Sequence, residues 1–252
     1  MNPLKPNNPI PLFLIGCLMG LLLFAGPAAA QDLSITLGEE GSLATRSVQL
    51  FILVTVLSLV PGIAMMVTCF PFIVTVLAIL RQAIGLQQSP PNMLMISLAL
   101  FLTYFVMEPV FVASWDAGIA PMLAGDIDVE SAFTLAMPPL RGFMVARINP
   151  DTLAELAALR PELSSTIEIQ DVPLSVIVPS FLLSEMERAF QVGFLIFIPF
   201  LIIDLVVAAV LMSMGMMMVP PAIVALPFKL AFFVVADGWS LIAASLVRGY
   251  TG

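Results

Sequence analysis

Long apolar stretches, separated by one polar segment, organise this chain. No charged residue occurs from Ser47 to Leu80. A continuous helix of that length would measure about 50 Å at about 1.5 Å per residue, against about 30 Å for the hydrocarbon core of a bilayer. Pro61-Gly62 and Pro71 interrupt this stretch, and proline removes a helix hydrogen bond. We therefore expect a broken helix or a helical hairpin. Interrupted backbone of this kind is tolerated inside a membrane only where it is buried in protein or lines a cavity.

Three further apolar stretches follow, at residues 94–113, 190–211 and 222–247. Each carries few charges, and a Met-rich turn followed by Pro220-Pro221 separates the last two. The pattern predicts an all-α membrane protein with broken hydrophobic helices and helical hairpins. Its parts are a mature N-terminal segment at 31–46, a first hydrophobic block at 47–113, an acidic insert at 114–178 and a second hydrophobic block at 179–252.

The insert at 114–178 has the composition of a small soluble helical segment, with acids well in excess of arginines. Pro138-Pro139 is expected to open one short helix, and Asn149 to cap another that runs through Arg160. We interpret the acidic excess as a solvated face. Beyond the insert, Ser184 to Glu187 has the spacing of a capping box, but we favour its lying inside a helix that begins at Pro179.

The first thirty residues have the pattern of a cleavable signal peptide. Lys5 precedes an apolar run, and Pro27-Ala28-Ala29-Ala30 ends it with small residues, so cleavage is expected after Ala30. Two alternatives stay open: an uncleaved first transmembrane helix, or a lipidated Cys17. With cleavage, the mature N-terminus and the insert at 114–178 are both expected outside the cytoplasm.

Composition narrows the function classes. Of 252 residues, 60% are hydrophobic and 10% charged, whereas about 25% is usual for a soluble domain. The formal net charge is −8, which argues against a nucleic-acid partner. The sequence has no His and two Cys, so the commonest general base and metal ligand is absent. We expect no enzyme activity, no catalytic residues, no metal site and no cofactor.

The second hydrophobic block contains several ionisable residues within or next to its apolar stretches. A charge in an apolar helix costs about 2.5–3.5 kcal/mol on insertion scales, so these residues are expected to pair or to face water. Because Lys229 and Asp237 are too far apart for a bridge on one helix, a pair between Lys229 and Asp204 across two helices is favoured. Helix pairing and channel lining both stay open as roles. The candidates are Glu185, Glu187, Arg188, Asp204, Lys229 and Asp237.

The second candidate site is the Met-rich turn. Methionine is flexible and polarizable, so it suits irregular or changing surfaces, and glycine lets the turn reshape. Three interpretations stay open: a packing role, a Cu(I) site of soft thioether ligands, and a compliant hydrophobic constriction in a pore. The candidate gate residues are Met212, Met214, Gly215, Met216, Met217 and Met218.

Long strings of this sequence resemble the FliP family of flagellar type III export-gate subunits. The resemblance is strongest from Pro179 to Pro221 and extends through Leu226 to Leu230 and Asp237 to Leu241. Upstream, residues 80–92, 98–103 and 139–144 are also similar to the family, whereas the insert matches more loosely. The resemblance covers roughly residues 45–252.

The resemblance implies a pore-forming and gating subunit of the flagellar protein export gate. It implies several copies of the chain assembled with FliQ and FliR in the basal body, in the bacterial inner membrane, with part of the chain extracytoplasmic. Unfolded flagellar subunits would be the transported partners, alongside other membrane proteins of the export apparatus. It also implies that the Met-rich turn faces the channel as a gasket. A methionine-lined Cu(I) transporter is the alternative, and a helix-packing scaffold is a third.

Overall fold

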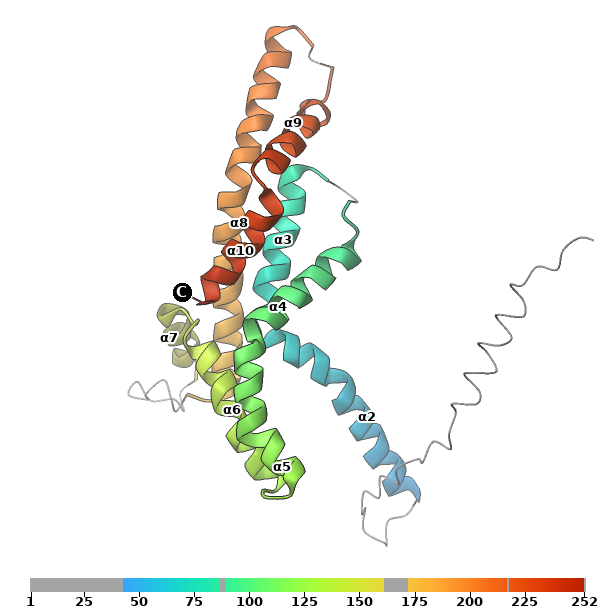
Figure 1. The fold of residues 1–252 in the computed structure, drawn as a ribbon, viewed down its shortest axis with the longest axis vertical. Helices are drawn as coiled ribbons and strands as arrows, with labels where there is room; N and C mark the ends of the chain where they lie inside the picture. Colours follow the sequence, from blue (N-terminus) through green and yellow to red (C-terminus); the bar gives the residue numbers. More distant parts are fainter. Residues whose placement is uncertain (1–42, 87–88, 161–171, 217, 252) are drawn as a thin grey trace, which may run out of the picture. The chain divides into compact units, whose positions relative to one another are not determined.

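The computed structural model describes residues 43–86, 89–160, 172–216 and 218–251, and every regular element in these ranges is a helix (Figure 1). The chain divides into two compact units, residues 1–56 and 57–252. The predicted signal peptide and the segment 31–42 lie outside the described residues. Three helices are long and apolar enough to cross a membrane, or four when one bent pair counts as a single span. The predicted all-α membrane fold is confirmed.

The first hydrophobic block forms two helices, α2 (Leu43–Met66) and α3 (Phe70–Ile84). The expected interruption at Pro61-Gly62 is wrong, because α2 continues through both residues. The break falls instead around Thr68, whose hydroxyl donates to the Met65 carbonyl at 2.9 Å and accepts from the Phe70 amide at 3.4 Å. Pro71 then occupies the first turn of α3, where its missing N–H leaves no hydrogen bond unmade.

The next segment contains five helical elements. They are α4 (Asn92–Ser114), a π-helical turn η1 (Trp115–Ile119), α5 (Ala120–Ala124), α6 (Val129–Val145) and α7 (Pro150–Ala158). Asn149 caps α7 as predicted, since its side chain accepts from the Asp151 amide at 3.0 Å. The helix expected to open at Pro138-Pro139 instead begins earlier, because Asp128 accepts from the Ser131 amide and caps α6. Hydrogen bonding by Ser131 also lowers the pKa of the Asp128 carboxyl.

The second block consists of α8 (Leu174–Ser213), α9 (Pro221–Val235) and α10 (Gly238–Thr251). Helix α8 begins directly after Pro173, not at the expected Pro179, which lies inside it. The limit between the insert and this block, placed at residues 178 and 179, therefore falls within a helix. Ser184 to Glu187 lies inside α8, as favoured above. Helices α9 and α10 form the bent pair, with an angle of 61° between them.

The core of residues 57–252 lies between α3 and its neighbours. Helix α3 packs against α8 and α4, and α8 also contacts α6, α7 and α9 (Figure 1). Ile73, Val76 and Leu80 of α3 are fully buried. Gly193 permits the close approach of α3 and α8, because a Cβ atom there would lie 2.4 Å from Ile79 Cδ1. This packing holds α8 in place, and α8 carries four of the six ionisable candidates and ends at the Met-rich turn.

Candidate functional site

The Met-rich turn follows the C-terminus of α8 in a Schellman arrangement. The amide of Gly215 donates to the Met212 carbonyl at 3.1 Å, and the amide of Met216 donates to the Leu211 carbonyl at 3.0 Å. Gly215 has a φ of +74°, a conformation that glycine adopts without the penalty of a Cβ atom. The sequence Ser213-Met214-Gly215 therefore ends the helix and reverses the chain toward α9.

Most of the methionine side chains of the turn are exposed. Met212 and Met214 are 61% and 66% exposed, Met216 is 42% exposed, and Met218 is 97% exposed. Met217 lies outside the described residues. An apolar groove of about 560 Å³ adjoins the turn, lined by the last turns of α8, by Met214 and Met216, and by Val224 and Phe228 of α9. The turn thus presents flexible thioether side chains next to a surface with almost no polar atoms.

Lys229 and Asp204 form the pair that the residue spacing favoured. The Lys229 ammonium lies 2.6 Å from Asp204 Oδ2 and also donates to the Ala83 carbonyl at 3.1 Å. Lys229 is 6% exposed, and Asp204 Oδ1 is buried without a hydrogen-bond partner among the described residues. The pair connects α9 with α8 and with the end of α3. Lys229 is buried, whereas 32% of the Asp204 side chain is exposed. The pair fixes the relative position of the helices, because separating the charges leaves the buried ammonium uncompensated.

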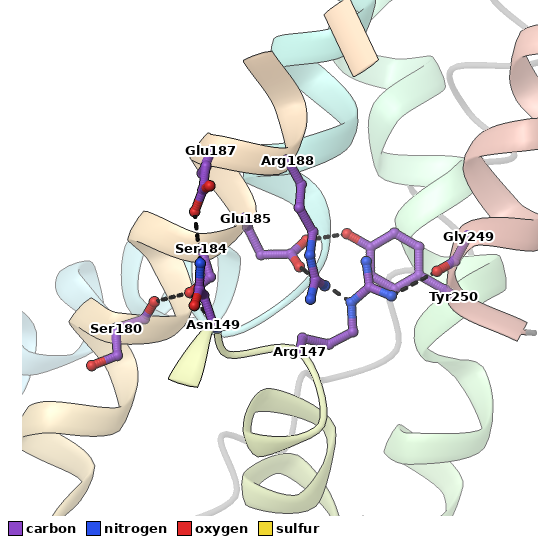
Figure 2. A network of polar contacts seen from close by, with 9 residues as sticks. All are labelled: Arg147, Asn149, Ser180, Ser184, Glu185, Glu187, Arg188, Gly249 and Tyr250. Atoms are coloured by element: carbon purple, nitrogen blue, oxygen red, sulfur yellow. Dashed lines mark hydrogen bonds and ion pairs between the residues drawn. The ribbon is translucent and has the colours of Figure 1, made fainter. Parts of the chain in front are cut away.

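Glu185 is the centre of the second polar cluster, which Figure 2 shows from close by. Its side chain is fully buried, with Arg147 Nε at 3.2 Å and Arg188 Nη1 at 3.5 Å from Oε1. The Tyr250 hydroxyl donates to Oε2. Arg147 further donates to the Gly249 carbonyl at 2.6 Å and lies 4.0 Å above the centroid of the Tyr250 ring. The cluster joins the segment after α6, the middle of α8 and the C-terminal end of α10.

The remaining candidates have other partners. Glu187 is exposed and accepts from the Asn149 side-chain amide at 3.2 Å and from the Gln191 amide at 3.1 Å. The Asn149 backbone amide also donates to the Ser184 hydroxyl at 2.8 Å. Asp237 lies at the bend before α10 with a φ of +49° and accepts from the Ser240 hydroxyl at 3.1 Å. The six ionisable candidates therefore comprise two ion pairs, Glu185 with Arg188 and Asp204 with Lys229, and two residues with other partners, and they do not form one site.

Sequence reasoning missed Arg147 and Tyr250. Arg147 was grouped with the solvated insert, and Tyr250 lies 65 residues beyond its partner Glu185. Only one signal in the sequence pointed to them. A buried acid such as Glu185 needs cationic or hydroxyl partners. Arg188, one helical turn away, pairs with only one of the two carboxylate oxygens. The structure supplies the remaining donors from distant parts of the chain.

The described residues contain no group of three or more His, Cys, Asp or Glu side chains that could hold a metal ion. Burial raises the pKa of the Cys69 thiol from 9.0 to about 12, so this side chain remains a neutral thiol at physiological pH. Together, the apolar helices, the ion pairs between them and the exposed apolar turn define an all-helical membrane protein whose apolar core is supplemented by internal polar contacts.

Comparison with known proteins identifies the family. The FliP family matches residues 53–246. The chain is 53% identical to the flagellar biosynthetic protein FliP of Caulobacter vibrioides over 227 residues, which cover 89% of this chain and 85% of that protein. It is 45% identical to FliP of Bacillus subtilis over 206 residues, covering 82% and 93%. FliP of Pectobacterium carotovorum is 44% identical over 241 residues, covering 93% and 92%.

The chain therefore belongs to the FliP family. As a member of this family, it is a flagellar biosynthetic protein of the export apparatus, with several helices capable of spanning a membrane. The copper-transporter hypothesis gains no support from this membership.

Proposed function

We propose that this chain is a structural, pore-forming and gating subunit of the flagellar type III export gate and catalyses no reaction. Copies of the chain assemble around a conduit with FliQ and FliR, in the inner membrane at the flagellar basal body. The conduit passes unfolded flagellar subunits. The observation that carries the proposal is the exposed methionine turn between two apolar helices, beside an apolar groove.

The turn suits a gate because of its side-chain chemistry. An apolar ring narrow enough to exclude water blocks ions without any charged group. Methionine side chains have several soft torsions and make non-directional contacts, so they yield to a passing polypeptide and close again behind it. Met212, Met214, Met216, Met217 and Met218 supply the thioethers, and Gly215 supplies the tight reversal that places them at the helix end.

The ionisable candidates have a holding role in this proposal. Lys229 and Asp204 fix α8 against α9, and Glu185 with Arg188 fixes α8 against the segment after α6 and against α10. Glu187 and Asp237 shape local structure through hydrogen bonds. The gate turn then moves while the body of α8 stays in place.

The test replaces Met216, Met217 and Met218 with Ala and measures ion leak through the assembled complex in membranes. We expect increased conductance at rest, because shorter side chains leave a wider, wetter constriction. A matched control replaces Met65, Met66 and Met93, which are exposed on other helices. Unchanged conductance in the gate variant contradicts the gasket, and a change in assembly yield alone favours a helix-packing scaffold.

The proposed topology has its own test. We propose that the signal peptide is removed after Ala30 and that the segment 114–178 lies outside the cytoplasm. N-terminal sequencing of the purified chain should then begin at Gln31. A cysteine-reactive, membrane-impermeant reagent should label Glu155→Cys in intact spheroplasts. An N-terminus at Met1, or labelling only after permeabilisation, contradicts this arrangement.

A further inference from the structure

One face of α4 exposes large apolar side chains at helical spacing, with a single acid among them. Glu108 lies in the middle of this face and is exposed. Its carboxylate has no hydrogen-bond or ion-pair partner among the described residues. The face, called here the α4 stripe, consists of Phe101, Tyr104, Phe105, Glu108 and Val112 of α4 together with Trp115, the first residue of η1.

Glu108 differs from most other exposed acids of the chain in its position. The exposed acids Asp126, Asp128, Glu130, Asp151 and Glu155 lie outside the candidate membrane spans. Glu108 instead lies inside the candidate span Asn92–Ala124, as does Asp116 nearer the end of that span. An acid on the apolar face of such a helix is costly in lipid, and it is expected to meet a cation from a neighbouring protein surface.

Among the described residues, one basic side chain is likewise exposed and without a partner. Arg248, near the end of α10, is exposed and has no partner among the described residues. Each other basic side chain that the structure describes contacts an acceptor. These contacts are Arg81 with Asn92, Arg141 with Val172, Arg147 and Arg188 with Glu185, Arg160 with Ser175, and Lys229 with Asp204.

Two small residues lie beside Arg248 on α10. Ser245 and Gly249 are exposed on the same side of α10 and are spaced by four residues. A Cβ atom on Gly249 would have nothing within 4 Å. Small residues at this spacing allow another helix to approach closely, and the large aromatic side chains of the α4 stripe would fill the shallow surface that they leave.

The two surfaces lie at one level of the fold. Helix α10 packs against α4 (Figure 1), and Val106 and Met107 share a buried core with Leu246. Glu108 follows Met107 directly and Arg248 lies two residues after Leu246, yet Glu108 and Arg248 do not pair within one chain. When copies surround an axis in a head-to-tail ring, groups at one level on different surfaces meet between neighbours.

We propose that the α4 stripe of one copy docks on the outer face of α10 of the next copy. Glu108 then pairs with Arg248, and the aromatic side chains cover Ser245 and Gly249. This inference rests on the proposed ring of copies and assigns the residues that join neighbouring copies within it. Each copy uses both surfaces once, so the contact propagates around a closed ring.

Cross-linking between two differently tagged copies tests this contact directly. One copy carries Glu108→Cys and the other carries Arg248→Cys, both with Cys17 replaced by Ser. Cys69 remains, since it is fully buried. The Cα atoms of a Glu–Arg pair are farther apart than the roughly 7 Å that a disulfide bridges, so the reagent is a short bifunctional maleimide. The control pairs Glu155→Cys with Arg248→Cys.

We expect a cross-linked dimer carrying both tags for the pair of positions 108 and 248, and no such dimer for the control. Absence of this dimer, while the two tagged chains still co-purify, overturns the contact and leaves the ring intact. Failure of the tagged chains to co-purify overturns the ring as well. The two failures are therefore distinguishable.

Charge reversal gives a second, independent measurement. Glu108→Arg and Arg248→Glu should each reduce co-purification of the tagged copies, because like charges then face each other. The two substitutions in one chain should restore it. Glu155→Arg, an exposed acid in the insert, should leave co-purification unchanged. A double variant as defective as the single variants contradicts the proposed pair.

Discussion

Helix α8 carries two regions of opposite character. Around Glu185, in the middle of the helix, the carboxylate is fully buried and has three partners from three parts of the chain. At its C-terminus, Met212 and Met214 are exposed, and Met218 beyond them is almost entirely exposed. The first region is specified by directional contacts that tolerate little movement. The second makes few contacts within the chain, and its side chains adapt easily.

The comparison separates two requirements of a gate. In the proposed gate, a frame keeps its position while the closing element changes shape. The polar contacts of α8 lie away from the turn that is proposed to close the conduit. Changes near Glu185 should therefore affect stability, whereas changes in the methionine turn should affect conductance with little effect on stability.

The largest effect on stability is expected for Glu185→Ala. Removing one partner of a buried ion pair leaves Arg147 uncompensated, and such changes cost about 3–5 kcal/mol. Thermal unfolding of the purified chain in detergent measures the loss. The control is Glu187→Ala, two residues away, because that carboxylate is exposed and bonded only to amides. Equal stability of the two variants would contradict the framing role of Glu185.

A smaller effect is expected for Asp204→Asn. The amide keeps the shape of the side chain but removes the charge 2.6 Å from the Lys229 ammonium, and a hydrogen bond to a charged group contributes about 1.5–3 kcal/mol. Adding Lys229→Met should recover part of the loss, because the buried ammonium is removed too. A double-mutant cycle checks this coupling. Additive losses would show that the two groups act independently.

Next in size is the effect of Gly193→Leu on the packing of α3 against α8. A Cβ atom at position 193 would lie 2.4 Å from Ile79 Cδ1, and overpacking of this kind costs about 1–3 kcal/mol. Ile79→Ala should relieve part of the loss. Gly142→Leu is the control, since a Cβ atom there has nothing within 4 Å. Denaturation in detergent compares the variants, and equal effects at positions 142 and 193 would argue against the close approach.

The smallest effect concerns the Cys69 thiol. Burial raises its pKa from 9.0 to about 12, so the folded chain holds the thiol proton more tightly than the unfolded chain does. Its contribution to stability is complete below pH 9 and is lost as the pH rises toward 12. At pH 8, maleimide should label Cys69 only after denaturation, as measured by peptide mass spectrometry. Rapid labelling of the folded chain would contradict the burial of this residue.

The helices could be predicted from the sequence because their apolar stretches are long and uncharged. Their ends could not be placed as well. Pro61 was read as a break, although Pro inside an apolar helix is tolerated where neighbouring groups satisfy the backbone. Pro71, also read as a break, instead marks the start of α3. At Pro138-Pro139, the cap supplied by Asp128 lies ten residues upstream of the proline pair, so the local signal was misleading.

The candidate sites could likewise be predicted where the partners lie in neighbouring sequence segments, and could not where distant segments supply them. The pair of Lys229 and Asp204 could be predicted because adjacent apolar stretches contain few charges, and because Asp237 is too far from Lys229 along one helix to be its partner. The donors to Glu185 were not accessible, since Arg147 and Tyr250 reach it only through the packing of α6, α8 and α10. The methionine turn was recognised from its composition alone, which the Schellman arrangement at Gly215 now explains in structural terms.

Imaging of the closed export complex tests the gating proposal most directly. The proposal predicts that the sulfur atoms of Met212, Met214, Met216, Met217 and Met218 from neighbouring copies converge on the axis and close the conduit there. Side chains of this turn directed toward lipid, with a different element blocking the conduit, would contradict it.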